Sequence, residues 1–443
     1  MAIKAALNSL GCAKNLVDAE RLLATLHQGG IEITADVADA DVMIVNTCGF
    51  ILSAKEEGIE TILEYVSLKQ EGRLKGIVVT GCLAQRYFEE MRQSIPEIDC
   101  ILTPGTNDRI CEAVIAAAEG RGFDAFEQPE KLKLTGDRVV STPDGFAYLK
   151  IADGCDNRCT YCKIPDIRGA FRSVPMEELV SEAADLAAQG VKELVVIAQD
   201  TTRYGVDLYG RPALVELLKK LAAVEGIEWI RIMYLYPDKI TDELLDYMAS
   251  EPKMVRYIEM PIQHSDAKVL AAMNRRGDEA SLLALVERIR TKLPGAVLRT
   301  TLMVGFPGED KATFQRMTEF VKKARFDRLG CFVFSPEEDT PAAAMTAPRA
   351  SAKTAERRQE IIMLEQSVIM EQKARERIGK TVRVLVEGFD RYAEYWFGRS
   401  TAEAPEVDPK IFFKAKGIAA GQMVDVRLTD VIDYDMIGEL CNG

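Results

Sequence analysis

Histidine is scarce in this sequence, which holds only His27 and His264 among 443 residues. Zinc sites of mixed cysteine and histidine type, and mechanisms that need several imidazoles, are therefore disfavoured. The sequence also lacks a run of about eighteen apolar residues and a charged-then-apolar leader. We therefore expect a cytoplasmic protein with no membrane partner.

Positive charge is in deficit: 56 Lys and Arg stand against 69 Asp and Glu, a net charge of -13. Sequence-independent binding to nucleic acid depends on neutralising phosphates, so this balance argues against it, although a local basic patch stays compatible. A chain of this length is too long for one compact core, and we expect two or three domains.

Residues 1–120 alternate short apolar runs with helical patterns, which is typical of a parallel sheet covered by helices. Strands are predicted at Lys4 to Asn8, Val42 to Asn46 and Ile77 to Thr80. Residues 121–143 are polar and patternless, and they are predicted to form a linker.

Residues 144–375 carry a longer series of six strand and helix patterns. The strands are predicted at Ala147 to Ala152, Leu194 to Ala198, Trp229 to Tyr234, Arg256 to Met260, Leu298 to Val304 and Cys331 to Phe334. These repeats suggest a barrel, complete or not, but an open doubly wound sheet has the same periodicity. A charged helix, roughly Ala352 to Ile378, leads out of this domain.

Residues 376–443 change character and predict a small all-β barrel of a kind that binds macromolecules. Short strands are expected at Thr381 to Val386, Tyr392 to Phe397 and Val424 to Leu428.

Ten cysteines in a chain without a secretion signal favour reduced thiols that bind a metal or cluster. Three of them, the loop cysteines, form a CxxxCxxC triplet: Cys155, Cys159 and Cys162. A structural zinc needs a fourth ligand, and the next cysteine, Cys331, is far along the chain. Three thiolates instead suit a four-iron cluster with one open iron, which S-adenosylmethionine could chelate and whose electron could cleave it to a radical.

A second set, the strand-end cysteines, follows the three strands predicted in residues 1–120: Cys12, Cys48 and Cys82. Parallel strands share one carboxyl edge, so these thiols can converge there. Glycines stand beside them and let the backbone approach a bulky inorganic group: Gly11, Gly49 and Gly81. A second three-cysteine cluster is predicted, the alternative being three buried cysteines. The remaining cysteines are expected to pack inside the protein: Cys100, Cys111, Cys331 and Cys441.

A family resemblance covers essentially the whole chain, and six sequence blocks between residues 8 and 309 are its landmarks: NSLGCAKNLVDAE (8–20), NTCGF (46–50), GCDNRCTYCKIPDIRG (154–169), QDTTRYGVD (199–207), PIQHSDAKVLAAMNRRG (261–277) and VGFPGE (304–309). On these blocks the chain resembles the methylthiotransferases of the radical S-adenosylmethionine superfamily. The opening SLGCxKNLVD, the QDTTRYGVD segment and His264 after Gln263 resemble the branch that modifies an aspartate of ribosomal protein twelve of the small subunit. Two positions depart from the family pattern, Ala13 in place of a frequent proline and Asp339 in place of the usual glycine.

The resemblance implies an α/β protein: an N-terminal parallel α/β cluster domain, a central radical S-adenosylmethionine partial (β/α)6 TIM-like barrel and a C-terminal all-β TRAM barrel. It implies S-adenosylmethionine and two [4Fe-4S] clusters, one held by the loop cysteines and an auxiliary one held by the strand-end cysteines. The auxiliary cluster either supplies sulfur or presents an added sulfide.

Six residues that follow predicted strands of the central domain are expected around S-adenosylmethionine: Gln199, Asp200, Gln263, His264, Gly305 and Glu309. Helix capping is an equal alternative for Gln199 and Asp200, as is a structural role for the His264 imidazole. Arg168 and Arg172 either meet the methionine carboxylate or an acidic target, or form solvated charge pairs. Arg275 and Arg276 are ambiguous in the same way.

The expected reaction is methylthiolation of the β-carbon of an aspartate in the ribosomal protein, since this C–H bond is not acidic enough for a general base. The expected partners are that protein and a flavodoxin-like or ferredoxin-like electron donor. A transfer-RNA adenosine methylthiotransferase is the second reading, and a non-catalytic iron-sulfur scaffold that binds ribosomal components is the third.

The charge of the last domain bears on the substrate. From Gly379 onward, eight Lys and Arg stand against eleven Asp and Glu, a net charge of -3. RNA-binding barrels are more often basic, whereas an acidic surface suits a basic ribosomal protein. Tyr395, Trp396 and Phe397 serve either as exposed anchors or as barrel core.

Overall fold

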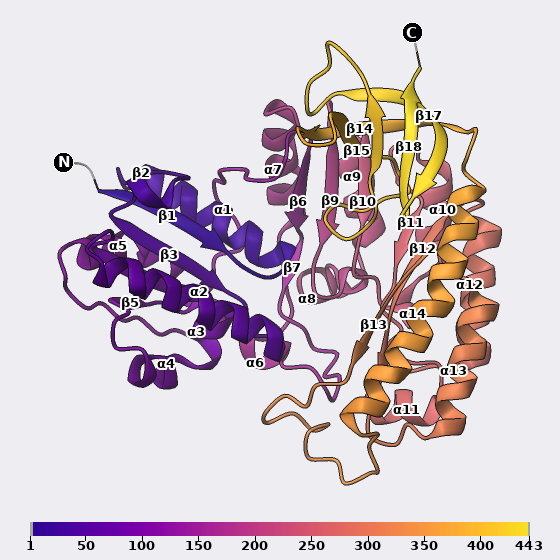
Figure 1. Cartoon of the computed structure of the whole chain (residues 1–443), viewed down its shortest axis with the longest axis horizontal. Helices are drawn as coiled ribbons and strands as arrows, with labels where there is room; N and C mark the ends of the chain where they lie inside the picture. The colour runs from indigo at the N-terminus through magenta and orange to yellow at the C-terminus, as the bar shows by residue number, and fades with distance from the viewer. Residues whose placement is uncertain (1–2, 442–443) are drawn as a thin grey trace. The chain divides into compact units, whose positions relative to one another are not determined.

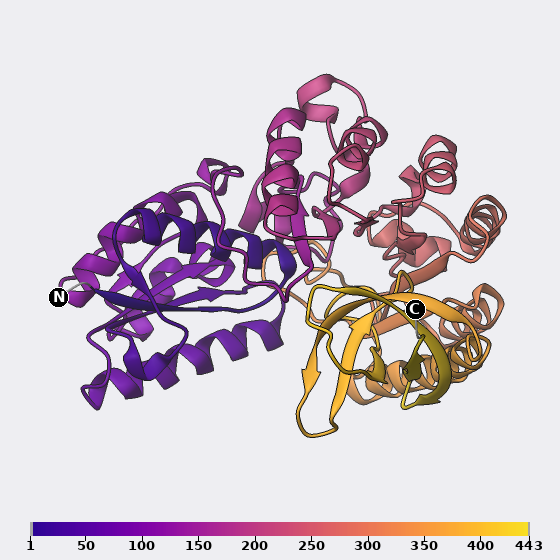
Figure 2. The ribbon, with the colours of Figure 1, turned by 90° about the horizontal axis from the view of Figure 1, so that it is seen from above.

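The computed structural model describes residues 3–441, which form two compact units (Figures 1 and 2). Unit 1 combines the chain up to Ser141 with two later segments, Ala152–Val174 and Glu337–Thr340. Unit 2 contains the other residues. The segment with the loop cysteines therefore folds together with the strand-end cysteines. Within residues 3–441, no helix is both long and apolar enough to cross a bilayer.

Unit 1 is built on a five-stranded parallel sheet of order β2-β1-β3-β4-β5, as the sequence predicted. Its strands are β1 (Lys4–Ser9), β2 (Glu32–Ile33), β3 (Val42–Thr47), β4 (Gly76–Gly81) and β5 (Cys100–Ile101). Its larger helices are α1 (Ala13–Gln28), α2 (Leu52–Gln70), α3 (Cys82–Arg86), α4 (Phe88–Ser94) and α5 (Ile110–Ala118). The later segment adds α6 (Ile164–Arg168) and the paired strands β7 (Ala152–Asp153) and β8 (Arg172–Ser173).

Both faces of this sheet are buried, which explains the unbroken apolar runs in β3 and β4. Successive side chains of a strand point to opposite faces. Val42 and Ile44 accordingly join the core made with α1 and α5, whereas Met43 and Val45 join the core made with α2 and α4. Helices on both faces leave the two edges and the strand ends as the open parts of the sheet.

The polar segment 121–143 is fastened to α1 rather than running free. Glu20 on α1 is almost fully buried and forms an ion pair with Arg138. Its Oε1 accepts a hydrogen bond from the Ser141 backbone at 2.7 Å, and the Val139 N–H donates to the Glu20 carbonyl at 3.1 Å. A buried carboxylate needs such partners, so the polar residues of segment 121–143 that contact Glu20 have a structural role.

The two departures from the family pattern fit their local backbone. Ala13 is the first residue of α1, a position that favours proline because its N–H has no partner inside the helix. Asp339 has a φ of +57°, in the left-handed region where glycine is free of strain and aspartate is tolerated.

The first part of unit 2 is a partial barrel of six strands, which confirms the barrel over the doubly wound sheet. The strands are β6 (Phe146–Lys150), β9 (Glu193–Ile197), β10 (Trp229–Ile232), β11 (Tyr257–Glu259), β12 (Val297–Val304) and β13 (Arg328–Val333). They form two parallel three-stranded sheets, ordered β10-β9-β6 and β11-β12-β13. A bridge between Ile230 and Met254 joins the sheets, so the strands follow chain order.

Helices cover the outside of this partial barrel (Figure 1). They are α7 (Met176–Ala188), α9 (Leu214–Ala222), α10 (Asp242–Ser250), α12 (Glu279–Lys292) and α13 (Lys311–Ala324). The short helices α8 (Val206–Tyr209) and α11 (Ala267–Ala272) lie in the loops that follow β9 and β11. The predicted charged helix is α14 (Ala352–Arg375), which packs against β13 and α13.

The C-terminal part of unit 2 is a closed barrel of order β14-β15-β16-β18-β17. Its strands are β14 (Thr381–Asp390), β15 (Tyr395–Arg399), β16 (Ile411–Lys414), β17 (Met423–Ile432) and β18 (Asp435–Leu440). The sequence predicted this barrel but missed β16 and β18. A four-residue strand such as β16 is too short for a period-two pattern to be recognised.

Buried ion pairs attach this small barrel to the amino ends of the larger one. Glu193, the first residue of β9, is fully buried and pairs with Arg231 at 2.7 Å and with Arg399 of the small barrel at 2.9 Å. Asp408 pairs with Arg299 at 2.8 Å and accepts a hydrogen bond from the Tyr257 hydroxyl at 2.6 Å. The carboxyl ends of the strands are left to the loops.

Replacing Glu193→Gln should destabilise unit 2 by about 3–5 kcal/mol, because it leaves two buried guanidinium groups short of a carboxylate. Both tryptophans, Trp229 and Trp396, lie in unit 2, so urea unfolding followed by their fluorescence measures this loss. The matched control is Arg383→Met, which removes an exposed pair with Glu228 at 3.4 Å and should cost less than about 1 kcal/mol. Equal effects of the two variants would contradict the prediction.

Acid should weaken the same junction. Burial by itself raises the pKa of Glu403, but the Arg377 and Arg328 guanidinium groups outweigh it and hold this pKa at about 2, against 4.5 for a free glutamate. The pairing therefore stabilises the fold above pH 4.5 and is lost as the pH falls towards 2, a change of about 3 kcal/mol. Glu403→Gln should flatten urea-derived stability between pH 5 and pH 2.5, whereas exposed Asp425→Asn should not. An unchanged slope in Glu403→Gln would argue against this coupling.

Candidate active site

The strand-end cysteines lie at one edge of the unit 1 sheet. Cys12 precedes α1 after β1, Cys48 follows β3, and Cys82 begins α3 directly after β4. These strands are neighbours in the sheet and run parallel, so their carboxyl ends meet. The structure thus brings these three thiols to a shared edge, as the sequence predicted.

Two glycines make this close approach sterically feasible. Gly11 has a φ of +95°, and a Cβ at this position would lie 2.6 Å from the Cys48 Cβ. A Cβ at Gly49 would lie 2.8 Å from the Cys82 carbonyl oxygen. A side chain at either glycine would therefore push two of the cysteine-bearing segments apart.

Electrostatics at this edge favours protonated thiols in the metal-free protein. The pKa of the Cys82 thiol is raised to about 12, mainly by burial; Arg168 opposes this shift, and the neighbouring Cys48 and Cys12 add to it. Burial also raises the pKa of Cys48. Because thiolates are the metal ligands, loading a cluster here has to release protons.

Arg168 contacts the strand-end cysteines directly. This residue ends α6, six positions after Cys162, and its Nε donates to the Cys82 Sγ at 3.3 Å. Its other nitrogens contact Asp18, Asp153 and Asn15. The side chain is only 2% exposed, so the solvated charge pair, one of the two alternatives for Arg168, is wrong. Its guanidinium contacts side chains of unit 1.

The loop cysteines sit on a turn that is closed at its base. The β7–β8 ladder pairs Ala152 with Ser173 and Asp153 with Arg172, and the Cys155 N–H donates to the Gly169 carbonyl at 3.1 Å. Gly154 has a φ of +76°, and a Cβ there would lie 2.0 Å from the Ala170 carbonyl oxygen. None of these three cysteines is in a disulfide, and each is partly exposed.

Both sets fit a four-iron cluster by the chemistry of their donors. Each is a trio of cysteines outside any disulfide, with adjoining glycines, and three thiolates leave one corner of a four-iron cluster open. Among residues 3–441, no three His, Cys, Asp or Glu side chains are grouped closely enough to hold one metal ion. In a four-iron cluster each thiolate bonds a different iron, so the thiols need not touch one another.

His264 and Glu309 form a buried network at the carboxyl edge of the partial barrel. The Asp266 backbone N–H donates to His264 Nδ1 at 2.9 Å, which places the proton of a neutral imidazole on Nε2, 3.2 Å from a Glu309 oxygen. The other Glu309 oxygen accepts from the Gly305 N–H at 2.9 Å and from Arg358 on α14. Both oxygens are engaged, so Glu309 fixes the turn at Gly305 and the loop at His264.

The other predicted cofactor residues also lie after barrel strands. Asp200 is buried, accepts from the Thr202 N–H at 3.1 Å and pairs with Lys239 at 2.7 Å, which confirms the capping role. Gln263 has a φ of +68° and bridges to Leu302 of β12. Gly305, with a φ of +76°, approaches Ala355 of α14. Gln199 follows β9 and is half-buried. Contact of any of these with S-adenosylmethionine stays a prediction.

The remaining arginine candidates bind the backbone of their own unit. Arg172 donates to the carbonyls of Pro129, Glu130 and Leu132 at 2.6–3.1 Å. Arg275 donates to the Pro261 carbonyl and stacks over the Tyr236 ring at 4.2 Å. Arg276 is exposed to solvent.

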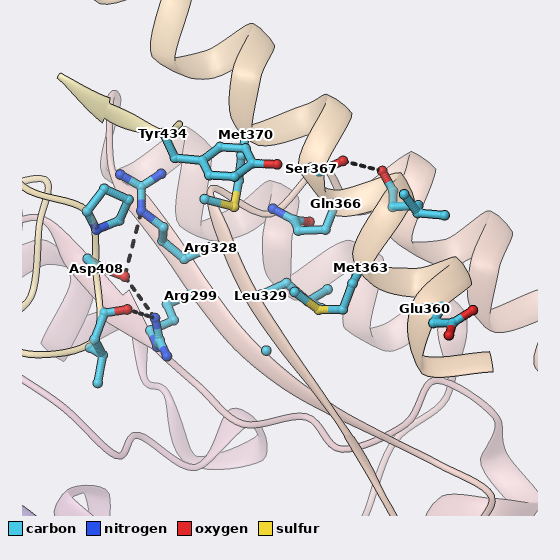
Figure 3. A pocket seen from close by; sticks show the side chains of 14 residues that line it. Arg299, Arg328, Leu329, Glu360, Met363, Gln366, Ser367, Met370, Asp408 and Tyr434 are labelled. Carbon is cyan, nitrogen blue, oxygen red and sulfur yellow. Dashed lines mark hydrogen bonds and ion pairs between the residues drawn. The ribbon is translucent and has the colours of Figure 1, made fainter. Parts of the chain in front are cut away.

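A cavity of about 780 Å³ lies at the other end of the large barrel (Figure 3). Its walls come from the starts of β12 and β13, from α14 and from the small barrel, and they include Arg299, Arg328, Met363 and Tyr434. In strand-helix barrels the reacting groups collect at the carboxyl ends of the strands. This cavity is therefore distinct from the site around His264 and Gly305.

The acidic surplus of the small barrel is largely hidden. Glu387, Glu403 and Asp408 are buried in ion pairs with arginines, and so is Arg399. The more exposed part of this barrel keeps eight acidic and seven basic side chains, which is close to neutral. The net charge of -3 counted from the sequence thus falls to -1 among the more exposed side chains. Tyr395, Trp396 and Phe397 are half-buried, and Trp396 packs against the barrel core.

Comparisons with known proteins agree with this architecture. Residues 4–103 match the uncharacterized protein family UPF0004, residues 149–321 the radical SAM superfamily, and residues 378–441 the TRAM domain. A solved structure of the radical S-adenosylmethionine methyltransferase TsrM from Kitasatospora setae shares the fold, with a TM-score of 0.60 and 15% identity over 77% of each chain. The family matches and the fold thus place the chain among the radical S-adenosylmethionine enzymes.

Full-length relatives narrow this class. The chain is 45% identical to the ribosomal protein uS12 methylthiotransferase RimO of Lachnoclostridium phytofermentans, over 97% of this chain and 98% of that protein. It is 46% identical to that of Pelotomaculum thermopropionicum, over 99% of both chains, and 44% identical to that of Clostridioides difficile, again over 99% of both. The chain belongs to the RimO family of ribosomal protein uS12 methylthiotransferases.

Gly11→Ala should disturb the strand-end cysteines, because the added methyl group meets the Cys48 Cβ while the backbone is held at a positive φ. We expect less iron per chain and a loss of stability beyond the strain of about 1 kcal/mol typical of such a backbone. Gly72→Ala is the matched control, since its φ of +76° is similar but its Cβ would meet nothing within 4 Å. Iron analysis and urea unfolding measure both effects; identical behaviour of the two variants would refute a steric role for Gly11.

Proposed function

We propose that this protein catalyses methylthiolation of the β-carbon of an aspartate in ribosomal protein uS12. The observation that carries the proposal is the 44–46% identity to uS12 methylthiotransferases over nearly the full chain. The two cysteine trios support it, because insertion of sulfur and methyl at an unactivated carbon needs both a radical source and a sulfur carrier.

The ligands in this proposal are the six cysteines of the two trios. The loop cysteines would hold the cluster that binds S-adenosylmethionine, and the strand-end cysteines would hold the auxiliary cluster. When bound, these groups supply a deoxyadenosyl radical and a sulfur that is ready for transfer. The cofactor would lie near Gln199, Asp200, Gln263, His264, Gly305 and Glu309.

The protein itself would bind, orient and shield the reactants. Gly305 keeps its backbone free of a side chain at the carboxyl edge of the barrel, and the Glu309 carboxylate holds that backbone in place. Asp200, His264 and Glu309 are buried, so they would support the loops at the carboxyl edge of the barrel without being exposed to solvent. On this reading they act as positioning residues.

The domain boundaries of the proposal are residues 1–120 for the auxiliary cluster, 144–375 for the radical chemistry and 376–443 for substrate docking. An electron donor of flavodoxin or ferredoxin type would reduce the clusters, and a ribosomal substrate implies action in the cytoplasm. Transfer RNA is the competing substrate, and the near-neutral exposed surface of the small barrel favours neither. Family membership therefore decides the choice of uS12.

The test is to incubate anaerobically reconstituted protein with S-adenosylmethionine, dithionite and purified uS12. An aspartate of uS12 should gain about 46 Da, the mass of a methylthio group in place of hydrogen. The variant C12A/C48A/C82A should still cleave S-adenosylmethionine but leave uS12 unmodified, whereas C155A/C159A/C162A should lose both activities. Each variant should retain about four iron atoms of about eight.

Two outcomes would overturn the proposal. One is modification of transfer-RNA adenosine while uS12 stays untouched. The other is zinc in place of iron, or a single cluster that persists in both triple variants.

A further inference from the structure

We infer that Arg168 is a positioning residue for the auxiliary cluster. The hydrogen bond from its Nε to the Cys82 Sγ holds that thiolate in place and raises the reduction potential of the cluster. This inference rests on the proposed role of the strand-end cysteines as cluster ligands.

The guanidinium is fixed on every side. Nε lies 3.3 Å from the Cys82 Sγ, Nη1 contacts Asp153 at 3.1 Å and also Asp18, and Nη2 lies 3.1 Å from the Asn15 Oδ1. The planar guanidinium projects its N–H groups in fixed directions. Asp18, Asp153 and Asn15 hold Nη1 and Nη2, which fixes the orientation of the guanidinium plane. The single N–H of Nε then points in one direction, towards Cys82.

Ion pairing alone does not explain this arrangement. Two carboxylates, Asp18 and Asp153, already exceed the single charge of Arg168, so the group does not need the sulfur for its own neutrality. The hydrogen bond instead stabilises the Cys82 sulfur, because a buried N–H donor disperses the negative charge of a thiolate ligand. Reduction adds an electron to the cluster, and a donor to its sulfur stabilises that added charge, so the potential rises.

The same side chain links the two cysteine groups of unit 1. Asp18 and Asn15 lie on α1, the helix that Cys12 precedes, and Cys82 opens α3. Asp153 lies in β7, directly before the loop cysteines, and Arg168 itself ends the helix that follows them. A displacement of the loop thus reaches Cys82 through one guanidinium.

The experiment uses the full chain with C155A/C159A/C162A as the parent, so that the paramagnetic signal of the reduced protein comes from the auxiliary cluster alone. Its midpoint potential is measured by redox titration followed by electron paramagnetic resonance. Adding Arg168→Gln should lower the midpoint potential. Adding Arg172→Gln should not, because Arg172 lies in the same segment but its side chain donates to backbone carbonyls.

A double change separates the hydrogen bond from charge. Arg168→Gln with Asp18→Asn removes one positive and one negative group, so the formal charge near Cys82 equals that of the parent. The potential should stay below that of the parent, because the N–H···S contact is still missing. Return to the parent value, or an unchanged potential in Arg168→Gln, would overturn the inference.

Folding and assignment are checked separately. Arg168→Lys keeps the buried positive charge, so this variant should fold, as circular dichroism would show. The lysine ammonium cannot reach all four partners, so the midpoint potential should still be lower than that of the parent. An unaltered potential in this variant counts against the inference. A parent that binds no iron would refute the cluster assignment itself, whereas iron with an unchanged potential refutes only the role of Arg168.

Discussion

The parallel arrangement of β1, β3 and β4 is the constraint on which the unit 1 site depends. Parallel strands end at one edge, so residues that follow them meet although they are about 35 positions apart in the chain. The approach is closer than ordinary side chains allow, and glycines at positions 11 and 49 make it feasible. A sheet with one strand reversed would carry its cysteine to the opposite edge.

The large barrel of unit 2 is also built from parallel strands, but its two ends have different roles. Its six strands also run parallel, and their carboxyl ends gather the loops of Asp200, His264 and Gly305. The amino ends are closed by the small barrel through buried pairs that centre on Glu193 and Asp408. One end of the large barrel is thus committed to stability, which leaves the other end for chemistry.

Buried charge is used in both units, and each time several partners share it. Arg168 forms hydrogen bonds with two carboxylates, an amide and a thiol. Glu309 forms them with an imidazole, a backbone N–H and Arg358. Burying an ionised group costs several kcal/mol unless it is paired and hydrogen-bonded. These groups are therefore fixed where they stand, and a fixed group can hold a loop or a ligand in a defined place.

The sequence alone determined what depends on local pattern: the strand runs, the two cysteine trios with their glycines, and the three-part α/β organisation. Tertiary structure decided what depends on distant partners. The loop cysteines fold into unit 1, Arg168 points at Cys82, and the acids of the small barrel turn inward to Arg377, Arg328 and Arg299. Spacing and periodicity indicate which face or edge a residue occupies. An ion pair such as Arg168–Asp18 joins residues 150 positions apart, and no local signal in the sequence marks the partner.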